Sequence, residues 1–197
     1  FENTATTATW ALWLLAQNPQ IQARVRMELA DTGLHADGLL ASCIDETLRL
    51  FSPVWSIGRE CVQETKLCGE TIPAGHIVFV SPWVQHRHSS FWEQPTTFHP
   101  DRFLSSACRN DGRYLPFGLG PQMCVGRMRS LTEIGAFVAT ILQERHITPI
   151  PSRESPEAVF RTIQRPEPGV YVRLTPRSQM TWSCGAVCAE GQADAAS

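Results

Sequence analysis

One cysteine of this chain stands in a setting that favours metal ligation. Cys124 follows the glycine-containing stretch Phe117-Gly-Leu-Gly-Pro-Gln-Met and precedes apolar residues at helical spacing. A thiolate at the start of a helix is stabilised by the helix dipole and by free backbone N–H groups. Glycines at 118, 120 and 126 let the backbone approach a flat ligand and donate N–H groups to the sulfur. These are the requirements of a thiolate that ligates haem iron.

The ordinary alternative for such a residue is a buried free cysteine in a turn. The whole pattern, Phe-x-x-Gly-x-x-x-Cys-x-Gly, resembles the haem-binding loop of cytochrome P450 enzymes. The resemblance implies haem b as the cofactor, with Cys124 as the axial thiolate and metal ligand. It also implies cofactor contacts by Phe117, Gly118, Gly120, Gln122, Cys124 and Gly126. Gln122 departs from the family, which usually has an arginine there to contact a haem propionate, because glutamine donates hydrogen bonds but carries no charge.

An acid and two arginines match a second motif of the same family. Glu46 and Arg49 are at i and i+3, so they share a helix face, and Arg102 lies in His-Pro-Asp-Arg-Phe. Such pairs alone are usually solvated surface residues. In the family, a Glu-x-x-Arg helix pairs with the arginine of a Pro-x-Arg-Phe segment under the haem loop. The resemblance therefore implies a structural role, in assembly rather than chemistry, for Glu46, Arg49 and Arg102.

Arg59 follows in Ser-Ile-Gly-Arg, ten residues after Arg49. The family often uses an arginine there to hold a haem propionate, while the alternative is an arginine at a strand edge. Because Gln122 is uncharged, we expect Arg59 to carry more of the propionate pairing in this chain.

The first residues bear on oxygen chemistry. Phe1-Glu2-Asn3-Thr4 resembles the end of the family's distal motif, with Glu2 at its acidic position and Asn3 at its alcohol position. The alcohol usually orders the water that protonates iron-bound dioxygen. Asparagine can hold a water but is no ionisable acid. Thr4 lies about 100° further round the helix, so it does not replace Asn3 directly. An ordinary polar helix face is the alternative; the resemblance assigns catalytic roles to Glu2, Asn3 and Thr4.

Two short segments fall where the family contacts its substrate. Val54 and Trp55 follow the third helix, and Thr162 and Ile163 lie near the tip of the last hairpin. Core packing is the alternative for these residues, and a tryptophan such as Trp55 serves it well.

The chain must hold these groups with helices and short strands. Apolar periodicity and the caps at Asn18-Pro19 and Gly33 predict three helices before residue 52 and one behind Cys124 that runs to about Glu144. The predicted helices cover residues 1–17, 19–30, 37–51 and about 125–144. The predicted strands are 54–57, 60–62, 66–68 and 77–81, followed by a closing hairpin of 159–163 and 170–174 with its turn at 166–169. Residues 83–116 lack periodicity.

Composition excludes several classes of function. The 197 residues carry a net charge of −2 and are 43% hydrophobic, with no basic run of the kind that binds nucleic acid. No apolar run approaches the roughly 20 residues that cross a bilayer, so no membrane anchor is visible. We expect a soluble, cytoplasmic bacterial protein, with an organelle or the endoplasmic-reticulum membrane as open alternatives. The start at Phe1, in mid-pattern, favours a piece of a longer protein.

The resemblance covers about residues 1–175 and implies the C-terminal, haem-binding part of the P450 fold: mainly α, with a small antiparallel β-sheet and its N-terminal part missing. Residues 176–197 are rich in Ser, Ala and Gly and are expected to be a disordered tail. The implied reaction inserts one oxygen atom of O2 into a small, lipophilic organic substrate. The implied partners are that substrate and an electron-transfer protein, either a ferredoxin or an NADPH-dependent reductase.

Two alternatives remain open at this point. Asn3 and Gln122 could mark a haem-thiolate enzyme that acts on peroxides by rearrangement, dehydration or peroxygenation. The chain could also be a truncated, non-catalytic product that binds haem poorly.

Overall fold

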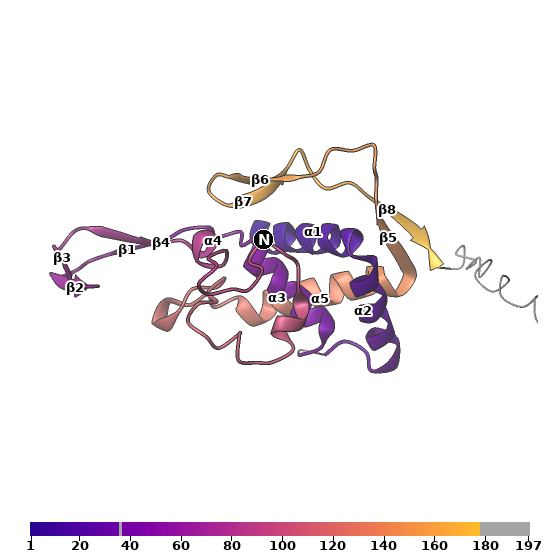
Figure 1. Ribbon diagram of the computed structural model, residues 1–197, viewed down its shortest axis with the longest axis horizontal. Helices are drawn as coiled ribbons and strands as arrows, with labels where there is room; N and C mark the ends of the chain where they lie inside the picture. The colour runs from indigo at the N-terminus through magenta and orange to yellow at the C-terminus, as the bar shows by residue number, and fades with distance from the viewer. Residues whose placement is uncertain (36, 178–197) are drawn as a thin grey trace, which may run out of the picture.

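The computed structural model describes residues 1–35 and 37–177. It is mainly α-helical with antiparallel strands, as the sequence predicted (Figure 1). The strands pair two by two. The helices are α1 (Glu2–Gln17), α2 (Pro19–Asp31), α3 (Leu39–Leu50), α4 (Pro82–Gln85) and α5 (Arg127–Glu144), with 3₁₀ turns η1 (Pro100–Phe103) and η2 (Gly120–Gln122). The strands are β1 (Ile57–Glu60), β2 (Thr65–Leu67), β3 (Glu70–Ile72), β4 (Ile77–Val80), β5 (Arg145–Pro149), β6 (Glu157–Phe160), β7 (Gln164–Glu167) and β8 (Val172–Pro176). The expected tail lies outside the described residues from residue 178 onward.

Helices α1, α3 and α5 form the centre of the molecule (Figure 1). The apolar run of α1 buries Trp10 and Leu15 completely, and full burial of such a side chain stabilises by about 1.5–3 kcal/mol. Helix α3 is buried on almost every side, and α5 contributes Ile134, Val138 and Leu142 to the same core. This shared core therefore fixes the start of α1 relative to the start of α5.

A buried glutamine ties three elements together. Gln22 of α2 has no exposed surface. Its Nε2 donates to the carbonyls of Leu15 and Ile147, at 3.0 and 2.8 Å, and its Oε1 accepts from the N–H of Ile147 at 3.1 Å. The amide thus satisfies backbone groups of α1 and β5 that a nonpolar side chain would leave unpaired.

The predicted strand at residues 54–57 is wrong for its first three residues. Strand β1 begins only at Ile57, where it pairs with Val80 of β4. The carbonyl of Trp55 instead accepts from the Ser81 hydroxyl at 2.7 Å, and the carbonyl of Pro53 accepts from the N–H of Gln164 at 2.8 Å. Because these backbone groups bond outside a ladder, the segment passes along the core as an irregular chain.

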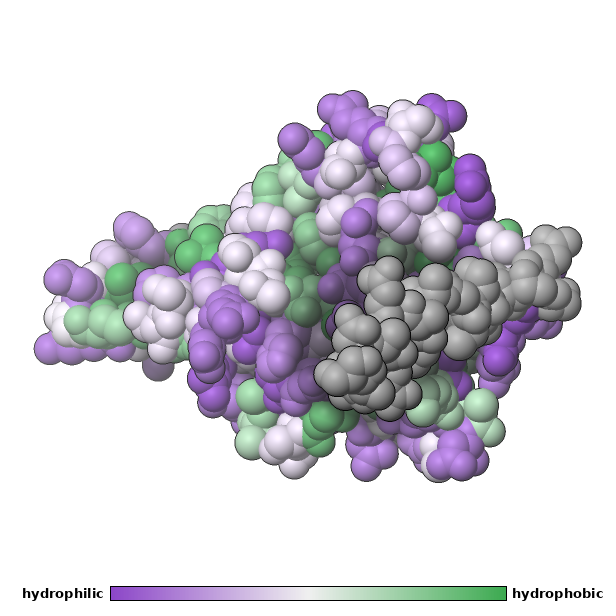
Figure 2. Space-filling model, turned by 45° about the vertical axis from the view of Figure 1, so that its right-hand side comes forward, coloured by the Kyte–Doolittle hydropathy of each residue, from purple (hydrophilic) through white to green (hydrophobic). Residues whose placement is uncertain are grey.

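The other strand predictions are shifted. Strand β1 ends at Glu60, so the predicted strand at 60–62 is not formed. Strand β3, which pairs with β2, lies where no strand was predicted. The β1–β4 ribbon extends away from the helices (Figure 1), and apolar side chains gather on its surface (Figure 2). Ile77 and Phe79 are among its exposed residues.

The predicted closing hairpin is also wrong in its pairing. Strand β6 pairs with β7 around a turn at residues 161–163, and β8 pairs with β5. The predicted turn at 166–169 therefore lies partly within β7. Sequence reasoning missed β5 because it follows α5 without an intervening turn signal and contains Pro149. Residues 83–116 contain only α4 and η1.

Candidate functional site

The loop before α5 turns back on itself to present Cys124. Gly118 and Gly120 both adopt φ of +74°, a left-handed conformation that glycine adopts without strain. The N–H of Cys124 donates to the carbonyl of Phe117 at 2.9 Å, which closes the loop. Helix α5 begins three residues later, and a Cβ placed on Gly126 would lie 3.8 Å from the sulfur. The thiol therefore lies beside the first turn of α5, where backbone N–H groups are free to face an anion.

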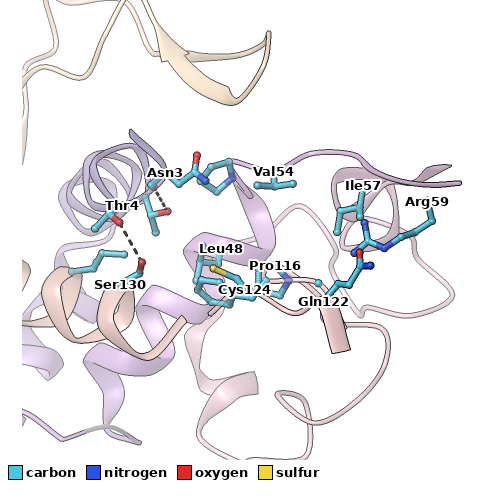
Figure 3. A pocket seen from close by; sticks show the side chains of 15 residues that line it. Asn3, Thr4, Leu48, Val54, Ile57, Arg59, Pro116, Gln122, Cys124 and Ser130 are labelled. Carbon is cyan, nitrogen blue, oxygen red and sulfur yellow. Dashed lines mark hydrogen bonds between the residues drawn. The ribbon is translucent and has the colours of Figure 1, made fainter. Parts of the chain in front are cut away.

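Cys124 faces a cavity of ≈ 250 Å³ (Figure 3). The cavity lies between the start of α1, the end of α3, the segment after α3 and the first turns of α5. Its lining is formed by Asn3, Thr4, Thr7, Leu48, Pro53, Val54, Ile57, Arg59, Pro116, Phe117, Gly118, Gln122, Cys124, Ser130 and Ile134. The lining combines apolar walls with a few polar groups, as is usual in ligand sites.

The cavity brings together most, but not all, of the residues expected from the sequence. The expected residues in its lining are Asn3, Thr4, Val54, Arg59, Phe117, Gly118, Gln122 and Cys124. The expected residues outside its lining are Glu2, Trp55, Gly120, Gly126, Thr162 and Ile163. Gly120 and Gly126 shape the loop rather than the wall. Glu2 is an exposed residue of the first helical turn.

Trp55 and the β6–β7 turn contact each other. The indole N–H of Trp55 donates to the carbonyl of Arg161 at 2.9 Å, and its ring meets Phe160 edge-on at 5.6 Å. Thr162 and Ile163 occupy the turn that follows. In the described residues, Trp55 therefore anchors this hairpin beside the segment that carries Val54.

At the α1 side of the cavity, two hydroxyl groups make hydrogen bonds within the described residues and one side-chain amide does not. The Thr4 hydroxyl lies 3.3 Å from the Ser130 hydroxyl of α5, and the Thr7 hydroxyl donates to the carbonyl of Asn3 at 2.9 Å. The side-chain amide of Asn3 makes no hydrogen bond within residues 1–35 and 37–177. It is therefore available to a group inside the cavity.

Arg59 and Gln122 lie at the same end of the cavity (Figure 3). Arg59 comes from β1 and donates one hydrogen bond, at 2.8 Å, to the carbonyl of Gly58. It makes no ion pair with a carboxylate of the described residues. This end of the cavity thus offers one uncompensated cation and one neutral amide.

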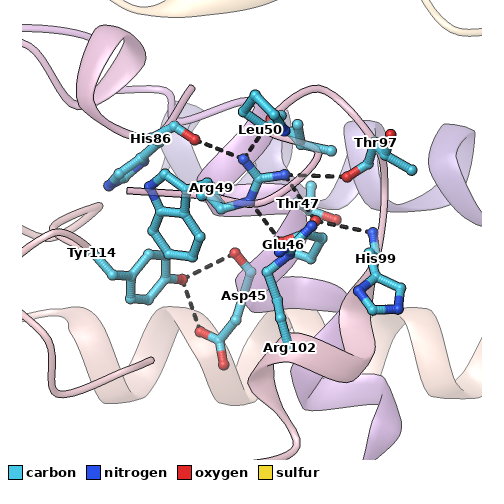
Figure 4. A network of polar contacts seen from close by, with 12 residues as sticks. Asp45, Glu46, Thr47, Arg49, Leu50, His86, Thr97, His99, Arg102 and Tyr114 are labelled. Carbon is cyan, nitrogen blue, oxygen red and sulfur yellow. Dashed lines mark hydrogen bonds and ion pairs between the residues drawn. The ribbon is translucent and has the colours of Figure 1, made fainter. Parts of the chain in front are cut away.

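Glu46, Arg49 and Arg102 meet in a buried network (Figure 4). Arg49 donates from Nε and Nη2 to the two oxygens of Glu46, both at 2.8 Å, and Arg102 Nε donates to Glu46 at 3.1 Å. The N–H of His99 adds a fourth bond to Glu46 at 2.9 Å. Glu46 and Arg49 are completely buried. The arrangement joins α3 to η1 and satisfies a carboxylate that would otherwise be costly to bury.

Arg49 also fixes the irregular stretch above η1. Its Nη1 donates to the carbonyls of His86 and Pro95, both at 2.6 Å, and its Nη2 to that of Thr97 at 3.2 Å. With the bonds to Glu46, all five guanidinium N–H groups are used. The stretch lacks regular structure because a side chain, not a ladder, takes its carbonyls.

A second buried network was not expected from the sequence. Asp45 accepts from Arg109 Nε at 2.5 Å and from the Tyr114 hydroxyl at 2.9 Å. Burial raises the pKa of the Asp45 carboxyl, and the hydrogen bond from Arg109 acts against that rise. Burial also raises the pKa of the Tyr114 hydroxyl. Only the position of Asp45 next to Glu46 could have pointed to this pair.

His86 is a buried, neutral imidazole. Its Nε2 accepts from the N–H of Leu115 at 3.0 Å, and burial lowers its pKa to about 3, with Arg49 acting in the same direction. The imidazole therefore serves as a hydrogen-bond acceptor in the scaffold.

Sequence reasoning also missed several lining residues. Thr7 lies one helical turn after Asn3, so periodicity alone could have identified it. Ser130 and Ile134 come from α5, and no local signal links them to α1.

Among the described residues, no three His, Cys, Asp or Glu side chains are arranged to hold a metal ion. A lone thiolate such as Cys124 suits a metal whose other ligands come from a prosthetic group. None of the described helices is both long and apolar enough to cross a bilayer.

Comparisons with known proteins agree with this geometry. The family model described as "Cytochrome P450" matches residues 1–173. Probable cytochrome P450 4aa1 of Drosophila melanogaster is 33% identical, over 89% of this chain and 37% of its own length. Taurochenodeoxycholic 6 alpha-hydroxylase of Sus scrofa is 32% identical, over 88% and 36%. Cyclooctatin synthase of Streptomyces melanosporofaciens is 34% identical, over 93% and 38%. The chain thus spans little more than a third of the length of these relatives.

Proposed function

Since the chain belongs to the cytochrome P450 family, we propose that it is the haem-binding part of a monooxygenase that inserts one oxygen atom of O2 into a small, lipophilic organic substrate. The observation that carries this proposal is the placement of the Cys124 thiol, beside the first turn of α5 and facing an apolar cavity of ≈ 250 Å³. Members of this family bind haem through a cysteine thiolate, and the loop is built to expose one.

The residues around the cavity fit a flat apolar group with a charged edge. Leu48, Ile134 and Phe117 offer apolar contacts, and the cation of Arg59 stands at one end beside Gln122. When bound, haem b supplies the O2 activation that underlies oxygen insertion.

Each polar residue then has a distinct task. Cys124 ligates iron through Sγ, and N–H groups at the start of α5 stabilise its charge. Arg59 pairs with a propionate, while Gln122 donates a neutral hydrogen bond to the same edge. Glu46, Arg49 and Arg102 hold the stretch that leads to the loop and take no part in the chemistry.

The residues at the start of α1 are proposed to hold water and transfer protons, on the side of the cavity away from Arg59 and Gln122. Asn3 can hold a water through its Nδ2 and Oδ1 atoms, because neither is committed elsewhere in the described residues. The Thr4 hydroxyl lies 3.3 Å from that of Ser130; when Ser130 donates this bond, the Thr4 proton is available to a group in the cavity. Glu2, exposed and outside the lining, would act through water.

The substrate side is assigned to Val54 and the β6–β7 turn. Val54 lines the cavity directly. Trp55, bonded to Arg161 of the turn, holds Thr162 and Ile163 near the cavity, where they would close over an apolar substrate. One relative is named a hydroxylase of taurochenodeoxycholic acid, which is consistent with a lipophilic substrate.

The electrons are proposed to come from a ferredoxin or an NADPH-dependent reductase, because members of the cytochrome P450 family generally use such redox partners. The cytoplasmic location expected from the sequence stays a prediction.

A second candidate is a haem-thiolate enzyme that acts on peroxides. Asn3, in place of an alcohol, favours it, since such a reaction would need no proton delivered from an alcohol at this position. Product formation from a hydroperoxide alone, without NADPH, would select this candidate. NADPH consumption in step with product would select the monooxygenase.

The thiolate is tested by the absorbance of the reduced, CO-bound protein. We expect the red-shifted band of a haem thiolate in the wild type and its loss in Cys124→Ser. Cys61→Ser changes a partly buried thiol that does not line the cavity, and it should keep the band. A band that survives in Cys124→Ser would reject the assignment. A band seen only in a longer form of the protein would identify this chain as a truncated product that binds haem poorly.

A further inference from the structure

A second cavity lies on the other side of α5. It encloses ≈ 360 Å³ between the α2–α3 connection, α3, α5 and the segment that carries Arg109, and it shares no lining residue with the Cys124 cavity. Helix α5 separates the two cavities. Ser130 and Ile134 line the Cys124 cavity, whereas Leu131 and Gly135, about 100° further round the helix, line the second cavity. Ligands in the two cavities would therefore not contact each other.

Most of the wall of this second cavity is apolar. Leu34, Ile44 and Leu131 line it, together with the backbone of Gly135. A Cβ on Gly135 would lie 3.7 Å from the methyl groups of Leu34. Its volume falls in the range of small-molecule sites, about 300–1,000 Å³. A bound molecule therefore needs an apolar body.

The rim of the second cavity carries one uncompensated positive charge. Asp45 is neutralised by Arg109 at 2.5 Å. It also accepts from the Tyr114 hydroxyl at 2.9 Å (Figure 4). The side chain of Arg127 has no ion pair and no hydrogen bond with the described residues, and its Nε is buried without an acceptor. His35 is engaged through Nε2 with the carbonyl of Thr32 at 2.6 Å. An unpaired buried N–H calls for an acceptor oxygen.

We propose that this second cavity binds an amphiphilic carboxylate of the fatty-acid type, with its carboxylate on Arg127 and its hydrocarbon body against Leu131 and Ile44. One negative charge balances the one uncompensated guanidinium, and a carboxylate can accept two parallel N–H bonds from it. A hydrated phosphate does not match, because the apolar wall offers nothing to replace its water.

The location is tested by photo-crosslinking. The purified chain is irradiated with decanoate that carries a diazirine at its hydrocarbon end, and the labelled peptides are identified by mass spectrometry. We expect labels on residues 34–44 or 128–135, and at least tenfold less label from the matching alcohol, decanol with the same diazirine. Labels confined to the Cys124 cavity, or equal labelling by the alcohol, would overturn the proposal.

The charge is tested by two arginine variants. Arg127→Gln should weaken decanoate binding, measured by isothermal titration calorimetry, by about tenfold. Arg129→Gln removes the same charge from an exposed side chain paired with Glu133 at 2.7 Å, and it should bind as the wild type does. Equal weakening in both variants would show general attraction of anions and contradict the site.

The apolar wall is tested independently of Arg127. Thr132 is an exposed residue of α5 that lines the second cavity, so Thr132→Trp can narrow it without disturbing the core. We expect this variant to lose the label on residues 34–44 and 128–135 while its far-UV circular dichroism is unchanged. Undiminished labelling, or displacement of the probe by millimolar inorganic phosphate, would contradict the proposal. These readouts remain decisive even if Arg127→Gln fails to fold.

Discussion

The Glu46–Arg49–Arg102 network and the Cys124 cavity both gather polar side chains, but they treat them in opposite ways. In the network, every N–H of Arg49 has an acceptor, and neither Glu46 nor Arg49 reaches solvent. Around the cavity, the amide of Asn3 and the guanidinium of Arg59 have no side-chain partner among the described residues. A closed set of polar groups holds the chain together, whereas an open set keeps its hydrogen-bonding capacity for a ligand. The two sets should therefore respond to mutation through different measurements.

The largest effect is expected from opening the closed network. Glu46→Gln keeps the shape of the side chain but leaves the buried charge of Arg49 unbalanced, and we expect a loss of about 3–5 kcal/mol in the free energy of unfolding, measured by urea denaturation. The surface pair of Arg24 and Asp101, at 2.7 Å with Arg24 half exposed, serves as the control. Arg24→Gln should cost at most about 1 kcal/mol. Similar losses in the two variants would remove the distinction between a closed network and an ordinary ion pair.

Two buried glutamines test whether hydrogen bonding or burial decides the cost. Gln22 and Gln164 both have no exposed surface, but the amide of Gln164 has no hydrogen-bond partner among the described residues. We expect Gln22→Met to lose about 1–3 kcal/mol of stability, because it leaves Ile147 without partners. Gln164→Met should change stability by less than about 0.5 kcal/mol or increase it, since no bond is broken. A larger loss at Gln164 in thermal denaturation would mean that its amide bonds to an ordered water.

The network should also impose a pH dependence through His86. Its folded-state pKa of about 3 lies below the unfolded value, so the unfolded state binds the proton first. Stability should therefore fall as the pH drops below about 6.5, with a slope of up to about 1.4 kcal/mol per pH unit from this residue. His86→Gln keeps an acceptor for the N–H of Leu115 and should lose this part of the slope. Parallel stability–pH curves for the two proteins between pH 6.5 and 4 would refute the assignment.

The closed network and the open cavity also differ in how far the sequence reveals them. Glu46, Arg49 and Arg102 could be placed together because three motifs occur in order, and the helices could be placed because apolar periodicity is a local property. The sequence does not predict the hydrogen bonds of Gln22 or the Asp45–Arg109 pair. A polar residue on a helix carries no local signal that identifies a partner far away in the chain. The predictions of a strand at 54–57 and of the closing hairpin were wrong for a related reason: strand pairing also depends on distant partners.

Pairing of those segments depends on which distant backbone groups are free. Apolar side chains at 54–57 fit a strand, but the carbonyl of Trp55 is taken by Ser81. The predicted partner of 170–174 was the nearest strand-like segment, 159–163. In the structure, β8 pairs instead with β5, which directly follows α5 in the chain. For the cavity, the sequence identified the lining residues that belong to family motifs, such as Asn3 and Cys124. The fold added others, among them Thr7, Ser130 and Ile134, from helical turns without a motif.

The smallest effect on the fold is expected from the open cavity, where only ligand retention should change. Arg59 is exposed on β1, and among the described residues its side chain bonds only to the adjacent carbonyl of Gly58. Arg59→Gln should therefore unfold at the same urea concentration as the wild type. Loss of a charge-assisted bond to a propionate should speed haem release by about tenfold, measured by transfer to excess apomyoglobin. Arg173→Gln, an equal charge change at an exposed residue of β8, should leave the rate of haem release unchanged.

A rescue variant sharpens this test. Because Gln122 offers no charge of its own, restoring a positive charge with Gln122→Arg should slow haem release in the Arg59→Gln background. If it does not, or if Arg173→Gln releases haem as fast as Arg59→Gln, this end of the cavity does not hold the propionates and the open groups there serve another ligand.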